Sequence, residues 1–182
     1  IQGFFDIPVD NMLGSSVLIP HIAGKFGVAR DDIVIVSPDL GSVNRARKFT
    51  EKLDLPLAII YKRRPKANVS EVMNIIGDVK GKRVMLIDDL IDTAGTLVHA
   101  ANALVDKGGA TEIYACATHG VLSGPAIERI QNSPIKELTI LDTIALPQNK
   151  MIDKINILNV APVFTEAIAR IYEEASVSTL FD

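Results

Sequence analysis

Two adjacent acids and a loop of small residues separate an apolar run from a helix in the segment from Val84 to Thr96. Asp88 and Asp89 end the apolar run, and Thr93-Ala94-Gly95-Thr96 follows shortly after. Backbone N–H groups in such a loop, aided by the dipole of the helix that starts there, can hold a phosphate. The carboxylates can accept hydrogen bonds from vicinal ribose hydroxyls. The segment therefore predicts a sugar-phosphate site, although an ordinary turn with Asp92 or Thr93 as the helix cap stays open.

A second cluster is cationic. Lys62-Arg63-Arg64-Pro65-Lys66 holds four basic residues in five positions, directly after an apolar run. Such a cluster can neutralise phosphate oxygens, with lysine acting as a point charge and arginine as a two-pronged donor. The open alternative is a solvated run of charges, which is the usual meaning of such a stretch.

A third candidate is Asp39, in the segment Ser37-Pro38-Asp39-Leu40-Gly41-Ser42 that follows another apolar run. Because it follows a predicted strand, Asp39 should lie at the carboxyl end of that strand, where ligands of parallel sheets bind. An aspartate after a strand can equally cap a plain turn, and this alternative stays open.

Short apolar runs alternate with helical patterns along the chain, and this alternation predicts an α/β fold. The predicted strands cover 33–37, 57–61, 83–88, 112–118, 137–141 and 154–158, and the predicted helices cover 44–53, 96–107, 125–131 and 162–174. Continuously apolar strands indicate a parallel sheet with helices on both faces. Ligands of such sheets bind beyond the carboxyl ends of the strands, where all three candidate clusters fall. The polar segment 62–82 fits no single element.

Composition narrows the function classes. The 182 residues carry a net charge of −3 and are 48% hydrophobic, which favours one globular domain and argues against a nucleic-acid-binding protein. No apolar run approaches the roughly 18 residues that span a bilayer, so no membrane partner is expected. The single cysteine, Cys116, cannot form an internal disulfide, and this favours the cytoplasm.

The segment 84–96 resembles the phosphoribosyl-diphosphate motif shared by type I phosphoribosyltransferases and ribose-phosphate diphosphokinases. Three further stretches resemble the bacterial diphosphokinase family in particular, as does the ending Ser176-Val177-Ser178-Thr179-Leu180-Phe181. They are Gln2-Gly3-Phe4-Phe5-Asp6-Ile7-Pro8-Val9-Asp10-Asn11, Tyr61 to Met73, and Thr118-His119-Gly120-Val121-Leu122-Ser123-Gly124-Pro125-Ala126. The likeness covers nearly the whole chain and corresponds to the C-terminal half of such an enzyme.

The resemblance implies a type I phosphoribosyltransferase-like fold and transfer of the diphosphoryl group of ATP to the 1-hydroxyl of ribose 5-phosphate. It implies Lys62 and Arg64 as catalytic residues and Asp39 as a ligand of Mg²⁺. The implied ribose 5-phosphate ligands are Arg64, Asp88, Asp89, Asp92, Thr93, Ala94, Gly95 and Thr96. One departure concerns the turn after Asp39, where Leu40-Gly41-Ser42 replaces the two-glycine turn that the family more often shows.

The resemblance also predicts the organisation of the chain. Residues 17–162 should form the catalytic domain, while 1–16 and 163–182 should pack on an absent N-terminal domain that supplies most of the ATP site. This fragment alone should bind ribose 5-phosphate with little turnover. The family suggests a homo-oligomer, a hexamer built from dimers. Two alternatives remain: a phosphoribosyltransferase, and a non-catalytic regulatory subunit that resembles the enzyme.

Overall fold

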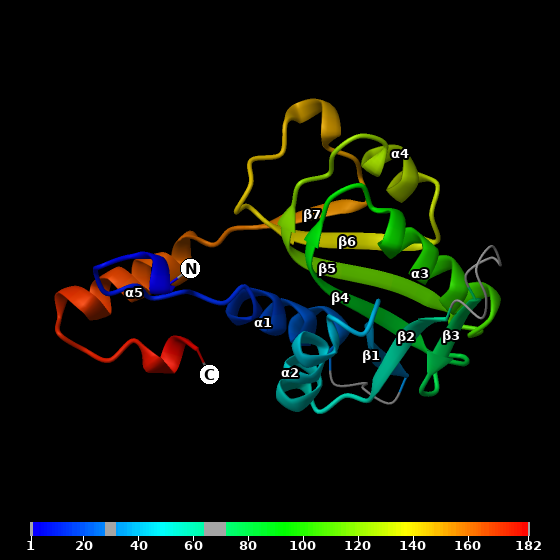
Figure 1. Cartoon of the computed structure of the whole chain (residues 1–182), viewed down its shortest axis with the longest axis horizontal. Coiled ribbons are helices and arrows are strands. Elements are labelled where there is room, and N and C mark those ends of the chain that lie inside the picture. The colour runs from blue at the N-terminus through cyan, green and yellow to red at the C-terminus, as the bar shows by residue number, and fades with distance from the viewer. Residues whose placement is uncertain (1, 28–31, 64–71, 182) are drawn as a thin grey trace.

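A seven-stranded sheet in the order β3-β2-β1-β4-β5-β6-β7 forms the centre of the protein (Figure 1). The structure is a computed structural model, and it describes residues 2–27, 32–63 and 72–181, with the backbone alone for Lys62, Arg63 and Val72. The strands are β1 (Ile33–Ser37), β2 (Leu57–Arg63), β3 (Val72–Ile76), β4 (Arg83–Ile91), β5 (Glu112–Gly120), β6 (Ile135–Leu141) and β7 (Ile155–Leu158). The helices are α1 (Ser15–Phe26), α2 (Val43–Leu53), α3 (Gly95–Asp106), α4 (Ala126–Gln131) and α5 (Ala161–Tyr172), with 3₁₀ turns η1 (Gln2–Phe4), η2 (Gln148–Lys150) and η3 (Ser178–Leu180).

Helices cover both faces of the sheet, as the continuously apolar strands predict. One face packs against α1 and α2, where Leu18, Ile22 and Phe49 are buried with Met85 of β4. The other face packs against α3 and α4, where the buried residues include Leu97, Leu104 and Ile130. Successive side chains of a strand point to opposite faces, so β4 contributes to both cores. The predicted fold class is therefore confirmed, and every predicted strand and helix is present within three residues of its expected bounds.

One helix and one strand were not predicted. Helix α1 begins at Ser15 and carries Pro20 in its interior, which is unfavourable within a helix and hides the pattern of its buried residues. Strand β3 lies within the unassigned segment 62–82 and pairs antiparallel with β2, whereas the other neighbouring strands in the sheet are parallel. Strand β2 consequently runs to Arg63, two residues beyond its predicted end.

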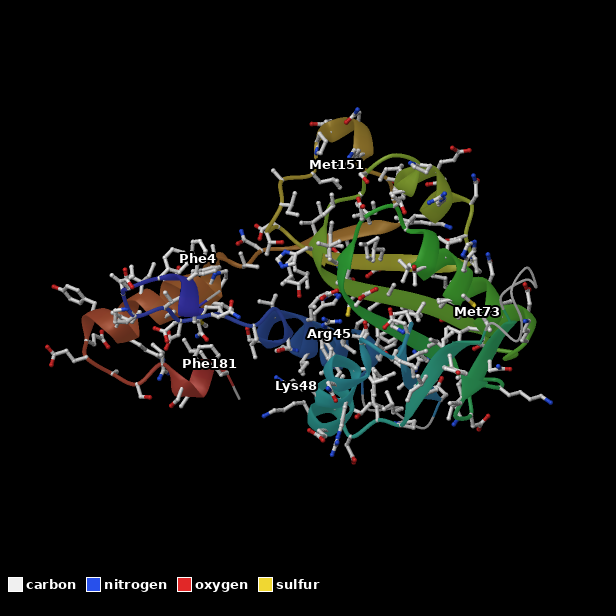
Figure 2. All side chains as sticks on the ribbon, viewed as in Figure 1. Phe4, Arg45, Lys48, Met73, Met151 and Phe181 are labelled. Atoms are coloured by element: carbon white, nitrogen blue, oxygen red, sulfur yellow. The ribbon has the colours of Figure 1, made fainter. Side chains whose placement is uncertain are left out.

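The two ends of the chain lie away from the sheet. Figure 1 shows α5 and the opening 3₁₀ turn at the end of the molecule that holds both termini, and Figure 2 places Phe4 and Phe181 there as well. Large apolar side chains are exposed in these segments, namely Phe4, Phe5, Ile7, Phe164, Ile168, Ile171 and Tyr172. Among the described residues, no helix has both the length and the apolar character needed to cross a membrane.

Gly77 ends the β3 strand with a φ of +110°, and a Cβ there would lie 2.9 Å from the Ala58 Cα of β2. Gly77→Ala should therefore lower the free energy of unfolding by about 3 kcal/mol, through backbone strain and overpacking. Gly81→Ala is the matched control, because Gly81 has a φ of +72° with open space around it, and it should lose only about 1 kcal/mol. Urea denaturation measures both values, and equal losses would contradict the close packing of β3 on β2.

Candidate active site

One cavity at the carboxyl edge of the sheet gathers most of the predicted site. Strands β1 and β4 run parallel, with Val36 opposite Leu86, so the residues that follow their carboxyl ends converge. The cavity has a volume of about 310 Å³ and is lined by Asp39, Asp88, Asp89, Leu90, Ile91, Asp92, Thr93, Ala94, Gly95, Thr96 and Leu97. Eight of the predicted residues are in this lining, and their roles stay predictions.

The loop between β4 and α3 presents backbone N–H groups without partners. Within the described residues, no hydrogen bond is donated by the amides of 93–97, and the first amide of this region to donate is that of Val98, to the Ala94 carbonyl at 3.0 Å. Asp92, Thr93 and Thr96 are exposed. The unpaired donors of a helix start require a ligand, a capping side chain or water. No side chain in the described ranges caps α3, so the loop is open to an anion.

The conformation of this loop depends on Ala94. It adopts the left-handed region, with a φ of +58°, while its side chain is 4% exposed and packs in the core. An αL residue next to αR residues turns successive N–H groups toward one point, which is the geometry of an anion-binding nest. The predicted use of Gly95, a close approach of phosphate to the backbone, fits a position where a Cβ would meet the Arg129 guanidinium at 3.4 Å.

The two acids of β4 have different environments. The Asp88 side chain is 15% exposed and the Asp89 side chain 58%. Arg45 of α2 contacts both, with Nη2 donating to Asp89 Oδ2 at 2.6 Å and Nη1 3.6 Å from Asp88 Oδ1. Figure 2 shows Arg45 on α2, near the centre of the molecule. The free protein thus holds a cationic side chain against the carboxylates that are predicted to accept ribose hydroxyls.

Burial raises the pKa of Asp88 to about 6, and the nearby charges of Asp89 and Asp39 add to this effect. Hydrogen bonds from the Asp89 amide, at 2.9 Å, and from Ser42 Oγ, at 3.3 Å, stabilise the carboxylate in the opposite sense. Asp88 consequently changes charge near neutral pH, which is unusual for an aspartate.

Asp39 receives a hydrogen bond from the Ser42 amide to its Oδ1 at 2.8 Å, the geometry of the capping turn left open above. The single-glycine turn is tolerated because Ser42 has a φ of −88°, which needs no glycine.

In the described residues, no three His, Cys, Asp or Glu side chains cluster for a metal. The oxygen donors of Asp39 and Asp88 in one cavity nevertheless fit Mg²⁺, which needs few carboxylates when substrate oxygens and water complete its shell.

The predicted catalytic pair is only partly described. Arg64 lies outside the described residues, and Lys62 is described as a backbone position in β2, opposite Met73 of β3. The antiparallel partner thus extends β2 as far as the start of the cationic cluster.

Three residues around the cavity had no role in the sequence analysis. Arg45 contacts the acids from α2, Ser123 Oγ hydrogen-bonds Asp92 Oδ1, and Arg129 Nη1 donates to the Thr93 carbonyl at 2.9 Å. Ser123 lies in the family-like stretch Thr118 to Ala126 and just beyond β5, the strand next to β4, where ligand-binding loops converge, but neither signal gave it a role. Nothing local distinguished Arg129 from other exposed helix residues.

Gly95→Ala should weaken ribose 5-phosphate binding at least tenfold, because the new Cβ would enter the space that an anion needs at the loop. Folding should be unaffected, since Gly95 has a negative φ and the nearest atom lies at 3.4 Å. Gly24→Ala is the control, because a Cβ added at Gly24 would have no other atom within 4 Å, and Gly24 lies in α1, away from the cavity. Titration calorimetry measures the affinities, and unchanged binding by Gly95→Ala would contradict the predicted phosphate site.

Asp88→Asn should alter the pH dependence of stability. The folded pKa near 6 exceeds the ordinary 3.8, so the native state keeps a proton that the unfolded chain releases between these values. The stabilising contribution of Asp88 is therefore full below pH 3.8 and is lost as pH rises through 6. The free energy of unfolding of Asp88→Asn, relative to the wild type, should rise by about 2 kcal/mol from pH 4 to pH 7.5. A relative stability that stays constant across this range would contradict the raised pKa.

Comparison with protein families and curated proteins gives a consistent result. The phosphoribosyl synthetase-associated domain family matches residues 62–182. Over 181 residues the chain is 67% identical to the ribose-phosphate pyrophosphokinase of Caldanaerobacter subterraneus subsp. tengcongensis and 62% identical to that of Clostridium perfringens. Both alignments include 100% of this chain and 56% of the relative, so the chain spans a little over half the length of these proteins.

Solved structures agree with the sequence comparison. Phosphoribosylpyrophosphate synthetase from Mycobacterium smegmatis is 38% identical, with a TM-score of 0.84, covering 96% of this chain and 55% of that one. Orotate phosphoribosyltransferase from Aeropyrum pernix shares the fold alone, at 16% identity and a TM-score of 0.53, covering 85% of this chain and 74% of that one. The resemblance inferred from the motifs is thereby confirmed, and the chain belongs to the phosphoribosyl synthetase-associated domain family.

Proposed function

We propose that this chain carries the ribose 5-phosphate site and part of the catalytic machinery of a ribose-phosphate diphosphokinase. The enzyme transfers the diphosphoryl group of ATP to the 1-hydroxyl of ribose 5-phosphate, giving 5-phosphoribosyl 1-diphosphate and AMP. One observation carries the proposal. The amides at 93–97, which have no acceptor in the part of the chain that the structure describes, lie beside Asp88 and Asp89 in one cavity. A pentose phosphate presents the anion and the vicinal hydroxyls that such a cavity accepts.

Binding proceeds through this chain's own groups. The loop amides and the hydroxyls of Thr93 and Thr96 hold the 5-phosphate, and the carboxylates of Asp88 and Asp89 accept hydrogen bonds from the ribose hydroxyls. The Arg45 guanidinium, which contacts both acids, moves aside or shares them when the sugar arrives. Phosphoryl transfer depends mainly on positioning and on neutralising charge, so the site needs few groups that react covalently.

The remaining charge neutralisation comes from two sources. Asp39 holds Mg²⁺, which supplies positive charge to phosphate oxygens when it is bound. Lys62 of β2 and Arg64 are the proposed catalytic residues, with Arg64 also contacting the sugar phosphate. Both act electrostatically on the transferred group.

The chain spans 56% of the length of its relatives, so other parts of such a protein supply most of the ATP site in this proposal. Residues 17–162 form the catalytic domain, while 1–16 and 163–182 pack against a further domain. The exposed apolar side chains of η1 and α5, such as Phe4, Ile168 and Tyr172, support this division, although the boundary at residue 16 falls within α1. We also propose a cytoplasmic homo-oligomer.

The direct test is product analysis with ATP and ribose 5-phosphate, using a protein as long as the relatives that includes this chain. AMP and 5-phosphoribosyl 1-diphosphate should form in equal amounts. A protein that forms neither, but converts added 5-phosphoribosyl 1-diphosphate and a nucleobase to a nucleotide and diphosphate, would instead be a phosphoribosyltransferase. Lys62→Ala should lower the rate at least about 100-fold, because transition-state charge loses a partner. Lys107→Ala, at the far end of α3, is the control and should leave the rate unchanged. Full activity of Lys62→Ala would contradict the catalytic role of that lysine.

A further inference from the structure

The supporting segment 121–131 consists of the loop that joins β5 to α4 and of α4 itself, and it contacts the loop 92–96. The Ser123 amide donates to the Asp92 carbonyl at 3.0 Å, and Ser123 Oγ hydrogen-bonds the Asp92 side chain. Further along the same segment, Arg129 Nη1 donates to the Thr93 carbonyl at 2.9 Å. Two successive carbonyls of the loop are therefore held by one neighbouring segment.

This supporting segment is itself fixed at both ends by lysines. Lys150 Nζ donates to the Leu122 carbonyl at 2.8 Å, and Leu122 is fully buried with a φ of +49°. At the other end of α4, Lys154 Nζ donates to the carbonyls of Ile130 at 3.3 Å, Gln131 at 3.0 Å and Ser133 at 2.9 Å. A cation at a helix C-terminus satisfies the carbonyls that the helix leaves unpaired. The backbone of Arg129 thus has little freedom to move.

Holding these carbonyls determines where the next amides point. In a trans peptide unit the C=O and the following N–H point in opposite directions. The bond from Ser123 to the Asp92 carbonyl therefore turns the Thr93 N–H away from the supporting segment. The bond from Arg129 to the Thr93 carbonyl does the same for the Ala94 N–H. Both of these amides are among those without a partner in the described residues, and both residues line the cavity.

Arg129 also contributes charge. Among the described residues, no carboxylate lies within ion-pair distance of its guanidinium. Its Nη1 lies 3.4 Å from the position that a Cβ on Gly95 would take. A positive charge so close to the loop favours binding of an anion there.

We propose that Arg129 is a positioning residue for the 5-phosphate, orienting the Ala94 amide through the Thr93 carbonyl and adding positive potential to the loop. The proposal rests on the proposed function, because it names a further residue of the same site. Ser123 shares the task through Asp92, while Arg129 alone adds charge. Since Arg129 acts through the backbone, its loss should affect affinity for the phosphate more than the chemical step.

The test compares Arg129→Gln and Arg129→Lys with Arg47→Gln, an outward-facing arginine of α2 that pairs with Glu51. Titration calorimetry with ribose 5-phosphate, inorganic phosphate and unphosphorylated ribose measures binding to this chain. Arg129→Gln should bind ribose 5-phosphate and phosphate at least tenfold more weakly, Arg129→Lys should lose less, and Arg47→Gln should match the wild type. Weak binding of ribose itself should be unchanged. In ¹H–¹⁵N spectra, the Ala94 amide should shift in Arg129→Gln while the core resonances stay in place, which shows that the fold is retained.

The outcomes separate this inference from the proposed function. If all variants bind ribose 5-phosphate equally well, the positioning role is wrong and the proposed function stands. If the wild type binds inorganic phosphate but not ribose 5-phosphate, and Arg129→Gln loses the phosphate, the positioning role stands and the proposed function fails. If the wild type binds neither, both fail. In an active protein of the relatives' length, Arg129→Gln should raise KM for ribose 5-phosphate with kcat nearly unchanged. A tenfold fall in kcat with KM unchanged would overturn the positioning role.

Discussion

The arrangement of the site depends on backbone amides that the fold leaves without acceptors. At 93–97 the chain leaves β4 and enters α3, and these N–H groups have no partner within the described residues. Such donors would be costly if buried, because a polar group removed from water must be paired. Here they face a cavity, so water or an anion can satisfy them. The parallel sheet makes this possible, since it brings β4 and the start of α3 to the edge where β1 delivers Asp39.

Negative charge beside a loop that is proposed to bind an anion looks contradictory, and the surroundings of the acids resolve it. Asp88 and Asp89 lie just before the loop, and each would repel a phosphate. Arg45 contacts both carboxylates, Ser42 donates to Asp88, and burial keeps Asp88 protonated to a higher pH than usual. The net field at the loop is therefore less negative than the sequence suggests. The acids remain available for neutral hydroxyl groups, which are hydrogen-bond donors without charge.

Local patterns allowed much of this fold to be predicted, and contacts between distant segments account for the rest. The β4 strand and the α3 helix could be recognised because their apolar periodicities lie within one short stretch. Strand β3 could not, since its antiparallel pairing with β2 depends on the path of the chain between them rather than on its own five residues. Arg129 was missed for the same reason. It lies 36 residues from Thr93, and only the β4–β5 pairing with the packing of α4 brings the two together.

Preorganisation connects the strained loop residue with its supports. A left-handed alanine costs about 1 kcal/mol, and the strain persists only where the surroundings hold it. At Ala94 the buried methyl group anchors the residue in the core below, while Arg129 and Ser123 hold the carbonyls of the two preceding residues from the side. Because the loop is held on two sides, its amides have their orientation before any ligand arrives. Binding then loses less conformational entropy than ordering a flexible loop would. By the same logic, residues as distant as Lys150 and Lys154 help to hold the loop in place, since they fix the segment from which Arg129 reaches it.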